Sequence, residues 1–127
     1  MFFFGKKKKE KKQEQAVPVA NKEELIAKAS EKVTELESKK GDERVSLLNE
    51  IGSLYTQAEE TDLAIKYYEE SLELCKQHGK ASTDLMKLYN KKRQEAAEAK
   101  DDEKVKEYMD KVQNLMQMSK DMIRGNA

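Results

Sequence analysis

The fold of this protein is decided by residues 48–72, LNEIGSLYTQAEETDLAIKYYEESL. The first half of this stretch places Leu48, Ile51 and Tyr55 three and four positions apart, with Gly52 directly after Ile51. Apolar residues at this spacing lie on one face of an α-helix. A glycine in the interior of a helix costs about 1 kcal/mol relative to alanine, so we expect Gly52 to be there because it lets a partner helix approach closely.

The second half of the stretch predicts another helix, which packs against the first. Ala64, Tyr68 and Ser71 are spaced by four and three positions, and they follow a short polar break around Glu60. A connection of only a few residues makes two consecutive helices antiparallel. The whole stretch therefore predicts a helical hairpin.

This hairpin resembles the tetratricopeptide repeat, whose signature is a large apolar residue, a Leu-Gly pair, a tyrosine, and then an alanine and an aromatic residue. The resemblance is specific over Leu48–Ser71, where Leu48 stands for the usual tryptophan and Ser71 for the usual small alanine. It implies an all-α fold, a short stack of antiparallel helical hairpins. It also implies a non-enzymatic adaptor that binds a peptide or protein partner through its helical surface.

A second, less regular hairpin follows in the sequence. Leu85 and Tyr89 follow Ile51 and Tyr55 at the period of the repeat, which is about 34 residues, although Met86 replaces the glycine. We expect seven extra residues in this hairpin, one added turn on each helix, which would form a protruding charged tip. This expectation rests on the next apolar triple, which comes seven positions later than the period would place it and consists of Val105, Met109 and Val112.

Upstream of the central stretch, a single amphipathic helix is expected to cap the stack. Ala29, Val33 and Leu36 show the same spacing of four and three positions, close to one repeat length before the first hairpin's triple. Asn21 and Glu24 form a pair typical of a helix start, with Asn at the cap and Glu three residues later. The chain thus contains half a repeat, one good repeat and one stretched repeat, fewer than the three that such stacks usually need. A partner, or another copy of the chain, could complete the stack.

The sequence divides into a basic arm with a linker over residues 1–20 and a helical domain over residues 21–124. We expect the arm to be disordered, because its lysines repel one another and Pro18 disfavours a helix. Five helices are expected in the domain, over about residues 22–39, 43–59, 62–78, 83–100 and 102–123.

The composition favours one domain of amphipathic helices. Of the 127 residues, 39% are charged and 37% are hydrophobic. The regular spacing of the apolar residues from Leu25 onward argues against a fully disordered chain. With Cys75 as the single cysteine and no apolar run long enough to cross a membrane, we expect the cytoplasm as the location.

The arm itself suggests an alternative function, that of a peripheral membrane protein. Residues 1–12 contain six lysines and one glutamate, which leaves the rest of the chain acidic. Lysines over an anionic lipid surface contribute about 1 kcal/mol each, and a short apolar plug adds to this. The arm could therefore hold the protein at the inner membrane surface, or it could be a solvated tail; a nucleic-acid partner is not expected, since no aromatic residues alternate with the lysines. The candidate membrane contacts are Phe2, Phe3, Phe4, Lys6, Lys7, Lys8 and Lys9.

No set of residues in the sequence indicates catalysis. There is no glycine-rich phosphate loop, no Cys–His pair and no spacing typical of metal ligands. His78, the only histidine, is expected in the last turn of a helix, where it interacts with the helix C-terminus. We therefore expect no enzymatic activity, no cofactor and no metal site.

The resemblance also suggests where a partner binds, because the first helix of each hairpin in this family lines a concave groove. The candidate partner-binding residues are Asn49, Ser53 and Thr56 on the first such helix and Lys87 and Asn90 on the next. Small polar side chains of this kind suit an extended peptide. Simple solvent exposure is the alternative explanation for all five.

The C-terminal end provides a second candidate surface. Met116, Met122 and Ile123 lie beyond the reach of the preceding helices, and uncovered apolar residues usually mark an interface. They could instead belong to a last helix that folds back on its neighbour. A self-associating, purely structural helical bundle is therefore a further alternative for the function.

Overall fold

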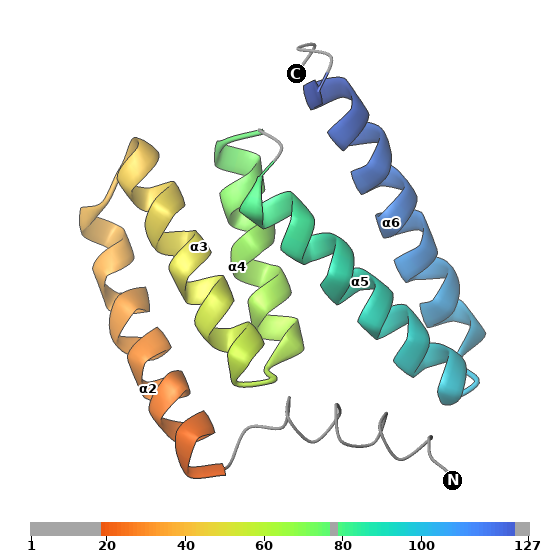
Figure 1. Cartoon of the computed structure of the whole chain (residues 1–127), viewed down its shortest axis with the longest axis horizontal. Helices are drawn as coiled ribbons and strands as arrows, with labels where there is room; N and C mark the ends of the chain where they lie inside the picture. The colour runs from red at the N-terminus through yellow and green to blue at the C-terminus, as the bar shows by residue number, and fades with distance from the viewer. Residues whose placement is uncertain (1–18, 77–78, 124–127) are drawn as a thin grey trace, which may run out of the picture.

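Five α-helices and one short 3-10 helix make up the described part of the chain (Figure 1). The structure is a computed structural model, and it describes residues 19–76 and 79–123. These residues contain no strand, so the prediction of an all-α fold with five helices is confirmed. The elements are α2 (Val19–Glu35), η1 (Leu36–Ser38), α3 (Gly41–Gln57), α4 (Thr61–Leu74), α5 (Lys80–Glu98) and α6 (Asp102–Ile123).

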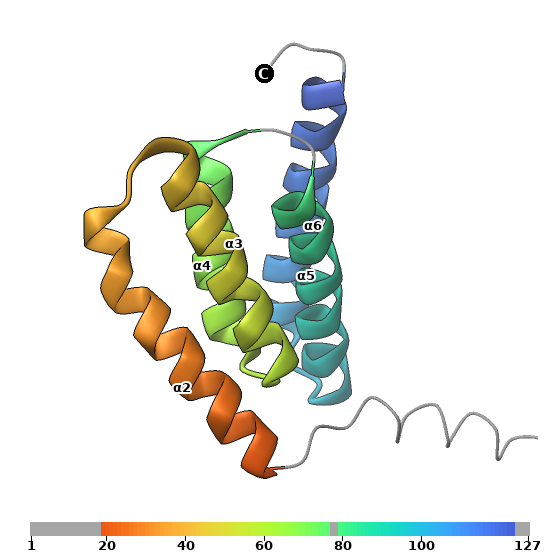
Figure 2. The ribbon, with the colours of Figure 1, turned by 60° about the vertical axis from the view of Figure 1, so that its left-hand side comes forward.

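The helices follow one another across the molecule in chain order, and each packs against the next (Figures 1 and 2). The most extensive interfaces are those of α3 with α4 and of α5 with α6. The chain therefore folds as two helical hairpins, with α2 packed on the outer side of α3. The last turns of α6 extend past the ends of the other helices (Figure 2).

The core of the stack is built from the central stretch and the start of α5. Leu48, Ile51, Tyr68, Ser71 and Leu85 are the largest fully buried side chains. Burying one such apolar side chain contributes about 1.5–3 kcal/mol. All of the residues assigned to the repeat core are buried: Leu48, Ile51, Gly52, Tyr55, Ala64, Tyr68, Ser71, Leu85 and Tyr89.

Gly52 lies at the closest approach of α3 and α4. A Cβ atom at this position would lie 2.9 Å from ring atoms of Tyr68, which is closer than such atoms approach in proteins. Next to this contact, the rings of Tyr55 and Tyr67 stack with their centroids 5.8 Å apart. The absence of a side chain at Gly52 is therefore what allows the aromatic ring to fill the space between the two helices.

The turns of the two hairpins have the same geometry. The α3–α4 turn passes through Glu59 at φ 65°, and the α5–α6 turn passes through Lys100 at φ 58°. In each turn, a backbone N–H five residues further on donates to a carbonyl of the preceding helix, that of Tyr55 in one case and that of Ala96 in the other. This is the left-handed turn that commonly ends a helix. The two turns are separated by the same interval as the two apolar triples, as the sequence predicts.

Away from the turn, the second hairpin differs from the expected one. Tyr89 packs against Tyr108, with ring centroids 6.3 Å apart, and the Nζ atom of Lys111 lies 5.5 Å from the Tyr89 ring centroid. This tyrosine pair matches Tyr55 and Tyr67 of the first hairpin, but Met86, the counterpart of Gly52, lines a groove with Met116, seven residues beyond the expected counterpart of Tyr68. In their position along the hairpin axis, the counterparts of Ala64, Tyr68 and Ser71 are therefore Val112, Met116 and Ser119. The distance in sequence between the two sets is one repeat period plus two insertions of seven residues.

The prediction of one added turn on each helix is thus corrected. On the side of the turn, each helix extends about two turns further beyond the repeat core than its counterpart in the first hairpin, although α5 as a whole is only two residues longer than α3. In an antiparallel pair, residues added to one helix require an equal length in the other before the turn can close. Seven residues in α5 and seven in α6 satisfy this condition, and seven residues correspond to about two turns. The sequence interval between the two turns exceeds the repeat period by only seven residues, because the residues added in α6 come after the second turn.

Three helix boundaries differ from the expected ones. α2 already includes Val19, so Asn21 lies inside the helix and is not its cap; an asparagine in a helix interior costs less than about 0.7 kcal/mol relative to alanine, and the helix tolerates it. α4 ends at Leu74, because Cys75 has an extended backbone with φ −139°. α5 begins at Lys80, earlier than expected.

The starts of α5 and α6 are fixed by side chains. Ser82 Oγ accepts a 3.1 Å hydrogen bond from the backbone N–H of Gly79 and donates a 3.0 Å bond to the Gly79 carbonyl. At α6, Asp101 Oδ1 accepts a 3.2 Å bond from the backbone N–H of Lys104. A side-chain oxygen that accepts from the third residue of a helix is the usual cap, so Asp101 caps α6.

Candidate binding surfaces

A polar groove runs along the face of the stack where α2, α3 and α5 meet. One part of the groove has a volume of about 570 Å³, and a second part has a volume of about 660 Å³. Gln57 lines both parts, so the two adjoin at this residue. We refer to it as the α2–α3 groove; its first part is lined mainly by Lys28, Lys32, Ser46, Asn49, Glu50 and Ser53.

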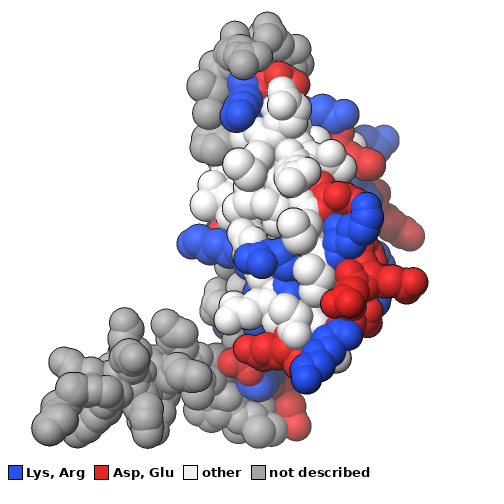
Figure 3. Space-filling view, turned by 90° about the vertical axis from the view of Figure 1, so that its right-hand side faces the viewer, with Lys and Arg blue, Asp and Glu red and all other residues white. Residues whose placement is uncertain are grey.

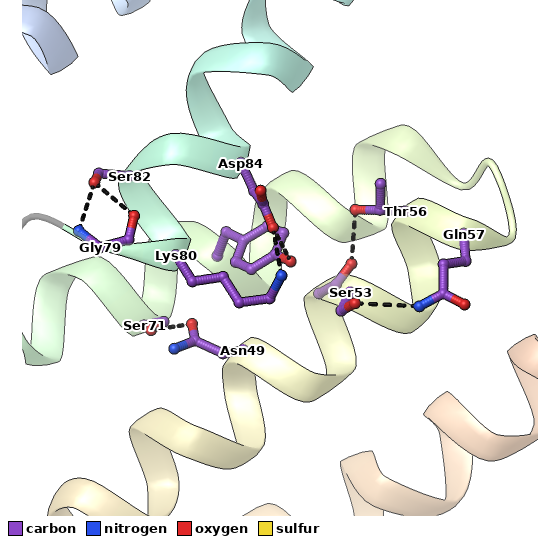
Figure 4. A network of polar contacts seen from close by, with 11 residues as sticks. Asn49, Ser53, Thr56, Gln57, Ser71, Gly79, Lys80, Ser82 and Asp84 are labelled. Atoms are coloured by element: carbon purple, nitrogen blue, oxygen red, sulfur yellow. Dashed lines mark hydrogen bonds and ion pairs between the residues drawn. The ribbon is translucent and has the colours of Figure 1, made fainter.

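The three candidate partner-binding residues of α3 all line the α2–α3 groove. Two of them already bond within the protein (Figure 4): Asn49 Oδ1 accepts a 2.7 Å hydrogen bond from Ser71, and Thr56 donates a 2.8 Å bond to the Gly52 carbonyl. Ser53 accepts a weaker bond from a neighbouring side chain of α3. The amide NH₂ group of Asn49 makes no hydrogen bond to the described residues, so this group is the one that a ligand can use.

The two candidate residues of α5 lie elsewhere. Lys87 is exposed and lines a different groove, between α5 and α6. Asn90 donates a 3.1 Å hydrogen bond to the Met86 carbonyl in its own helix and accepts one from Arg93 at 3.4 Å. The structure therefore brings three of the five candidates to one groove and leaves the other two outside it.

Lysines that the sequence did not single out surround Asn49. Lys28 and Lys32 reach the α2–α3 groove from α2, and Lys80 reaches it from the start of α5. Lys32 forms a 3.2 Å ion pair with Glu50, whereas Lys28 is exposed and has no carboxylate partner among the described residues. The spacing of four between Lys28 and Lys32 places them on one face of a helix and could have indicated this surface.

A buried tyrosine anchors the floor of this region to α5 (Figure 4). The hydroxyl of Tyr68 donates a 2.7 Å hydrogen bond to Asp84 Oδ2, which also accepts a 2.9 Å bond from Lys80. Burial and the adjacent carboxylate raise the pKa of Tyr68 well above its usual value. Burial alone would raise the pKa of Asp84, but the bonds from Tyr68 and Lys80 hold that pKa below its usual value. Asp84 is therefore a charged, structural residue.

A second tyrosine joins the same two helices in the reverse sense, from α5 to α4. Tyr89 of α5 donates a 2.5 Å hydrogen bond to Glu69 Oε2 of α4, and Lys111 of α6 lies 3.4 Å from the same oxygen. Burial and the Glu69 carboxylate raise the pKa of Tyr89. These residues border a cavity of about 380 Å³ between α4, α5 and α6. Three helices thus meet at one carboxylate.

Ion pairs at the surface join helices that are distant in the sequence. Lys22 of α2 pairs with Glu59 at 2.5 Å, and this hydrogen bond lowers the pKa of Glu59. Lys92 of α5 pairs with Asp62 of α4 at 3.0 Å, and this hydrogen bond raises the pKa of Lys92. Exposed pairs of this kind contribute about 0–1 kcal/mol, so they orient the helices more than they stabilise them.

The predicted apolar surface on α6 is present in part. Met116 is 47% exposed and Met109 is 45% exposed, whereas Leu115 on the opposite side of the helix is 3% exposed and belongs to the core. α6 therefore packs on α5 through one face and leaves a second apolar face uncovered. The other two candidates, Met122 and Ile123, have side chains outside the described part.

The candidate membrane contacts, Phe2 to Phe4 and Lys6 to Lys9, lie outside the described residues, as does His78. No helix in the described part of the chain has both the length and the apolar character to cross a membrane. Within residues 19–76 and 79–123, no three metal-binding side chains are grouped as a metal site would require. Cys75 is a free, partly exposed thiol.

The sequence matches no protein-family model, and no curated protein and no solved structure shows significant similarity to it. The surfaces of this chain alone therefore carry the case for its function.

Proposed function

We propose that this protein is a non-enzymatic interaction module of the tetratricopeptide type, which binds an extended segment of a protein partner in the α2–α3 groove. The observation that carries the proposal is that the two parts of this groove adjoin at Gln57 and together are lined by residues along α2 and α3. An extended peptide needs such a surface, with polar groups that can bond to its backbone.

The chemistry of the groove supports this proposal. The Asn49 amide group and the exposed Lys28 ammonium are hydrogen-bond donors that no described residue occupies. Backbone carbonyls of an extended peptide are acceptors, so these donors suit them. The bond from Ser71 fixes the orientation of the Asn49 side chain before a ligand arrives, which lowers the entropy lost on binding.

Selection from a phage-displayed library of random peptides tests the proposal, with the immobilised full chain as the target. We expect enriched peptides that bind the purified protein in solution. A variant with Lys28→Glu and Ser46→Arg changes two exposed positions of the groove and should abolish this binding. The matched control carries Lys66→Glu and Ser30→Arg, which make the same changes at exposed positions outside the lining of the groove.

Peptides that bind the groove variant and the control equally well would contradict the proposal, as would a selection that enriches nothing. The alternative of a membrane tether depends on residues 1–12, and the described residues provide no observation that favours it. It stays a prediction from the sequence, which co-sedimentation of the full chain with anionic liposomes would test against a chain that lacks residues 1–16.

A further inference from the structure

The second hairpin has a groove between the N-terminal half of α5 and the C-terminal half of α6. This groove, the α5–α6 groove, has a volume of about 430 Å³. Its floor is apolar, because the exposed thioether side chain of Met116 lies beside Met86. The other residues that line it are Thr83, Lys87, Ser119 and Lys120, with the buried Ser82 below them.

The α5–α6 groove occupies the position at which the first hairpin receives a helix. Tyr68 of the first hairpin is fully buried, and α5 covers it through Asp84. Met116 lies at the same level of the second hairpin, where no helix of the described residues covers it, and it is 47% exposed. The groove thus has the form of a helix–helix interface with one helix missing.

The charges along the groove have one sign. Among residues 19–76 and 79–123, the charged residues that line it are Lys87 and Lys120, and neither forms an ion pair with a carboxylate of this part of the chain. Figure 3, viewed from the side of α6, shows a band of uncharged surface with charged residues along its edges. An occupant must therefore be apolar where it meets the methionines and acidic at its flanks.

We propose that the α5–α6 groove binds an amphipathic helix of a partner protein, with an apolar stripe over Met86 and Met116 and with aspartate or glutamate residues facing Lys87 and Lys120. Methionines suit such a contact, because their flexible side chains adapt to the partner. Two other occupants are disfavoured by charge. A second copy placed groove to groove would bring the lysines of both copies together, and the chain's own residues 6–12 carry six lysines of the same sign.

This inference extends the proposed function, that of an interaction module, to a second surface, but it does not depend on the α2–α3 groove. The probe is a synthetic amphipathic peptide of about five helical turns, with leucines at helical spacing and glutamates at the flanking positions. One control peptide has lysines in place of the glutamates, and another has the same composition in scrambled order. Each is titrated into the full chain with labelled methionine methyl groups.

We expect the acidic peptide alone to bind saturably and to shift the methyl signals of Met86 and Met116. A variant with Lys87→Glu and Lys120→Glu should weaken this binding about tenfold or more, since each reversed charge becomes repulsive. The matched control, Lys40→Glu with Lys66→Glu, changes two exposed lysines that line neither groove, has the same net charge and should bind within about twofold of the unchanged protein. Circular dichroism of each variant verifies that the helices are intact.

Several results would overturn the inference: no saturable binding, equal binding of the basic peptide, methyl shifts at other methionines only, or equal weakening by both variants. A dimer in light scattering that Met116→Glu disrupts would overturn it in favour of a second copy. If this inference alone fails, peptides selected from the library still bind and remain sensitive to Lys28→Glu with Ser46→Arg. If the proposed function alone fails, the acidic helix still binds although the library enriches nothing.

Discussion

The hydroxyl of Tyr68 on α4 donates a 2.7 Å hydrogen bond to Asp84 on α5, and this bond has a counterpart that runs the other way. Tyr89 on α5 donates a 2.5 Å bond to Glu69 on α4. Each carboxylate is also contacted by a lysine, at 2.9 Å by Lys80 in one case and at 3.4 Å by a lysine of α6 in the other. The interface between the two hairpins is therefore fixed by two reciprocal phenol–carboxylate bonds, in addition to its apolar contacts.

Removal of one hydroxyl from this interface should destabilise the fold measurably. We expect Tyr68→Phe to lower the free energy of unfolding by about 1–2 kcal/mol, because a hydrogen bond to a charged, partly buried carboxylate is lost. Urea denaturation followed by circular dichroism gives this value. Tyr67→Phe is the matched control, since the Tyr67 hydroxyl makes no hydrogen bond to the described residues. Equal losses in both variants would show that the Tyr68–Asp84 bond contributes nothing specific.

The same bond predicts how stability depends on acid pH. The pKa of Asp84 is lower in the folded protein than in the unfolded chain, where an aspartate titrates at about 4. The contribution of Asp84 is therefore complete above about pH 4 and is lost as the pH falls through the folded pKa. In urea denaturation at a series of pH values, the unchanged protein should exceed Asp84→Asn in stability at about pH 7, and the difference should shrink towards about pH 3. A difference that stays constant over this range would contradict this assignment.

Gly52 should tolerate no side chain as long as the Tyr68 ring fills the interface. Alanine favours a helix by about 1 kcal/mol over glycine, but overpacking of a core costs about 1–3 kcal/mol, so we expect Gly52→Ala to be net destabilising. A double-mutant cycle with Tyr68→Leu separates the two effects, because the smaller side chain leaves room for a methyl group. In that background Gly52→Ala should stabilise the protein. If it destabilises both proteins equally, the ring contact is not the reason for the glycine.

The length of the second hairpin provides a test of its packing levels. Deletion of residues 90–96 together with residues 105–111 removes about two turns from each helix and joins Tyr89 to the original turn. Since Val112 then follows the turn as Ala64 does in the first hairpin, we expect a cooperative thermal unfolding transition. Its midpoint should be lower than that of the full chain, because the contacts of Lys92 and Lys111 are lost. A variant with only one of the two deletions shifts the residues of one helix along the other, so its unfolding midpoint should be lower than that of the variant with both deletions. If the variant with both deletions had the lower midpoint, the correspondence of Val112 with Ala64 would be contradicted.

Much of the fold could be predicted because its signals are local. The spacing of Leu48, Ile51 and Tyr55, the glycine among them and the short break at Glu60 together specify a tight hairpin, whatever the rest of the chain does. The length of the second hairpin was harder to predict. An insertion of seven residues is close to two helical turns, so the apolar residues stay on the same helix face, and the comparison with the first hairpin reveals only one of the two insertions. The matching addition in α6 became visible when Met86, the counterpart of Gly52, was found to line one groove with Met116.

The candidate surfaces were less predictable, for a physical reason. Asn49, Ser53 and Thr56 follow one another at helical spacing, so their common groove could be expected from α3 alone. The lysines opposite them come from α2 and α5, and only the crossing of three helices brings Lys28 and Lys80 to the same groove. The position of Lys87 in another groove likewise depends on how α6 packs on α5.

The most direct test of the proposed binding function is the location of a bound peptide. Amide chemical shifts of the ¹⁵N-labelled full chain should be followed during titration with a peptide selected from the library. We predict saturable changes concentrated at Lys28, Asn49, Ser53 and Gln57, along the α2–α3 groove. Changes confined to α4 and α6, or no saturable change at any residue, would contradict the account.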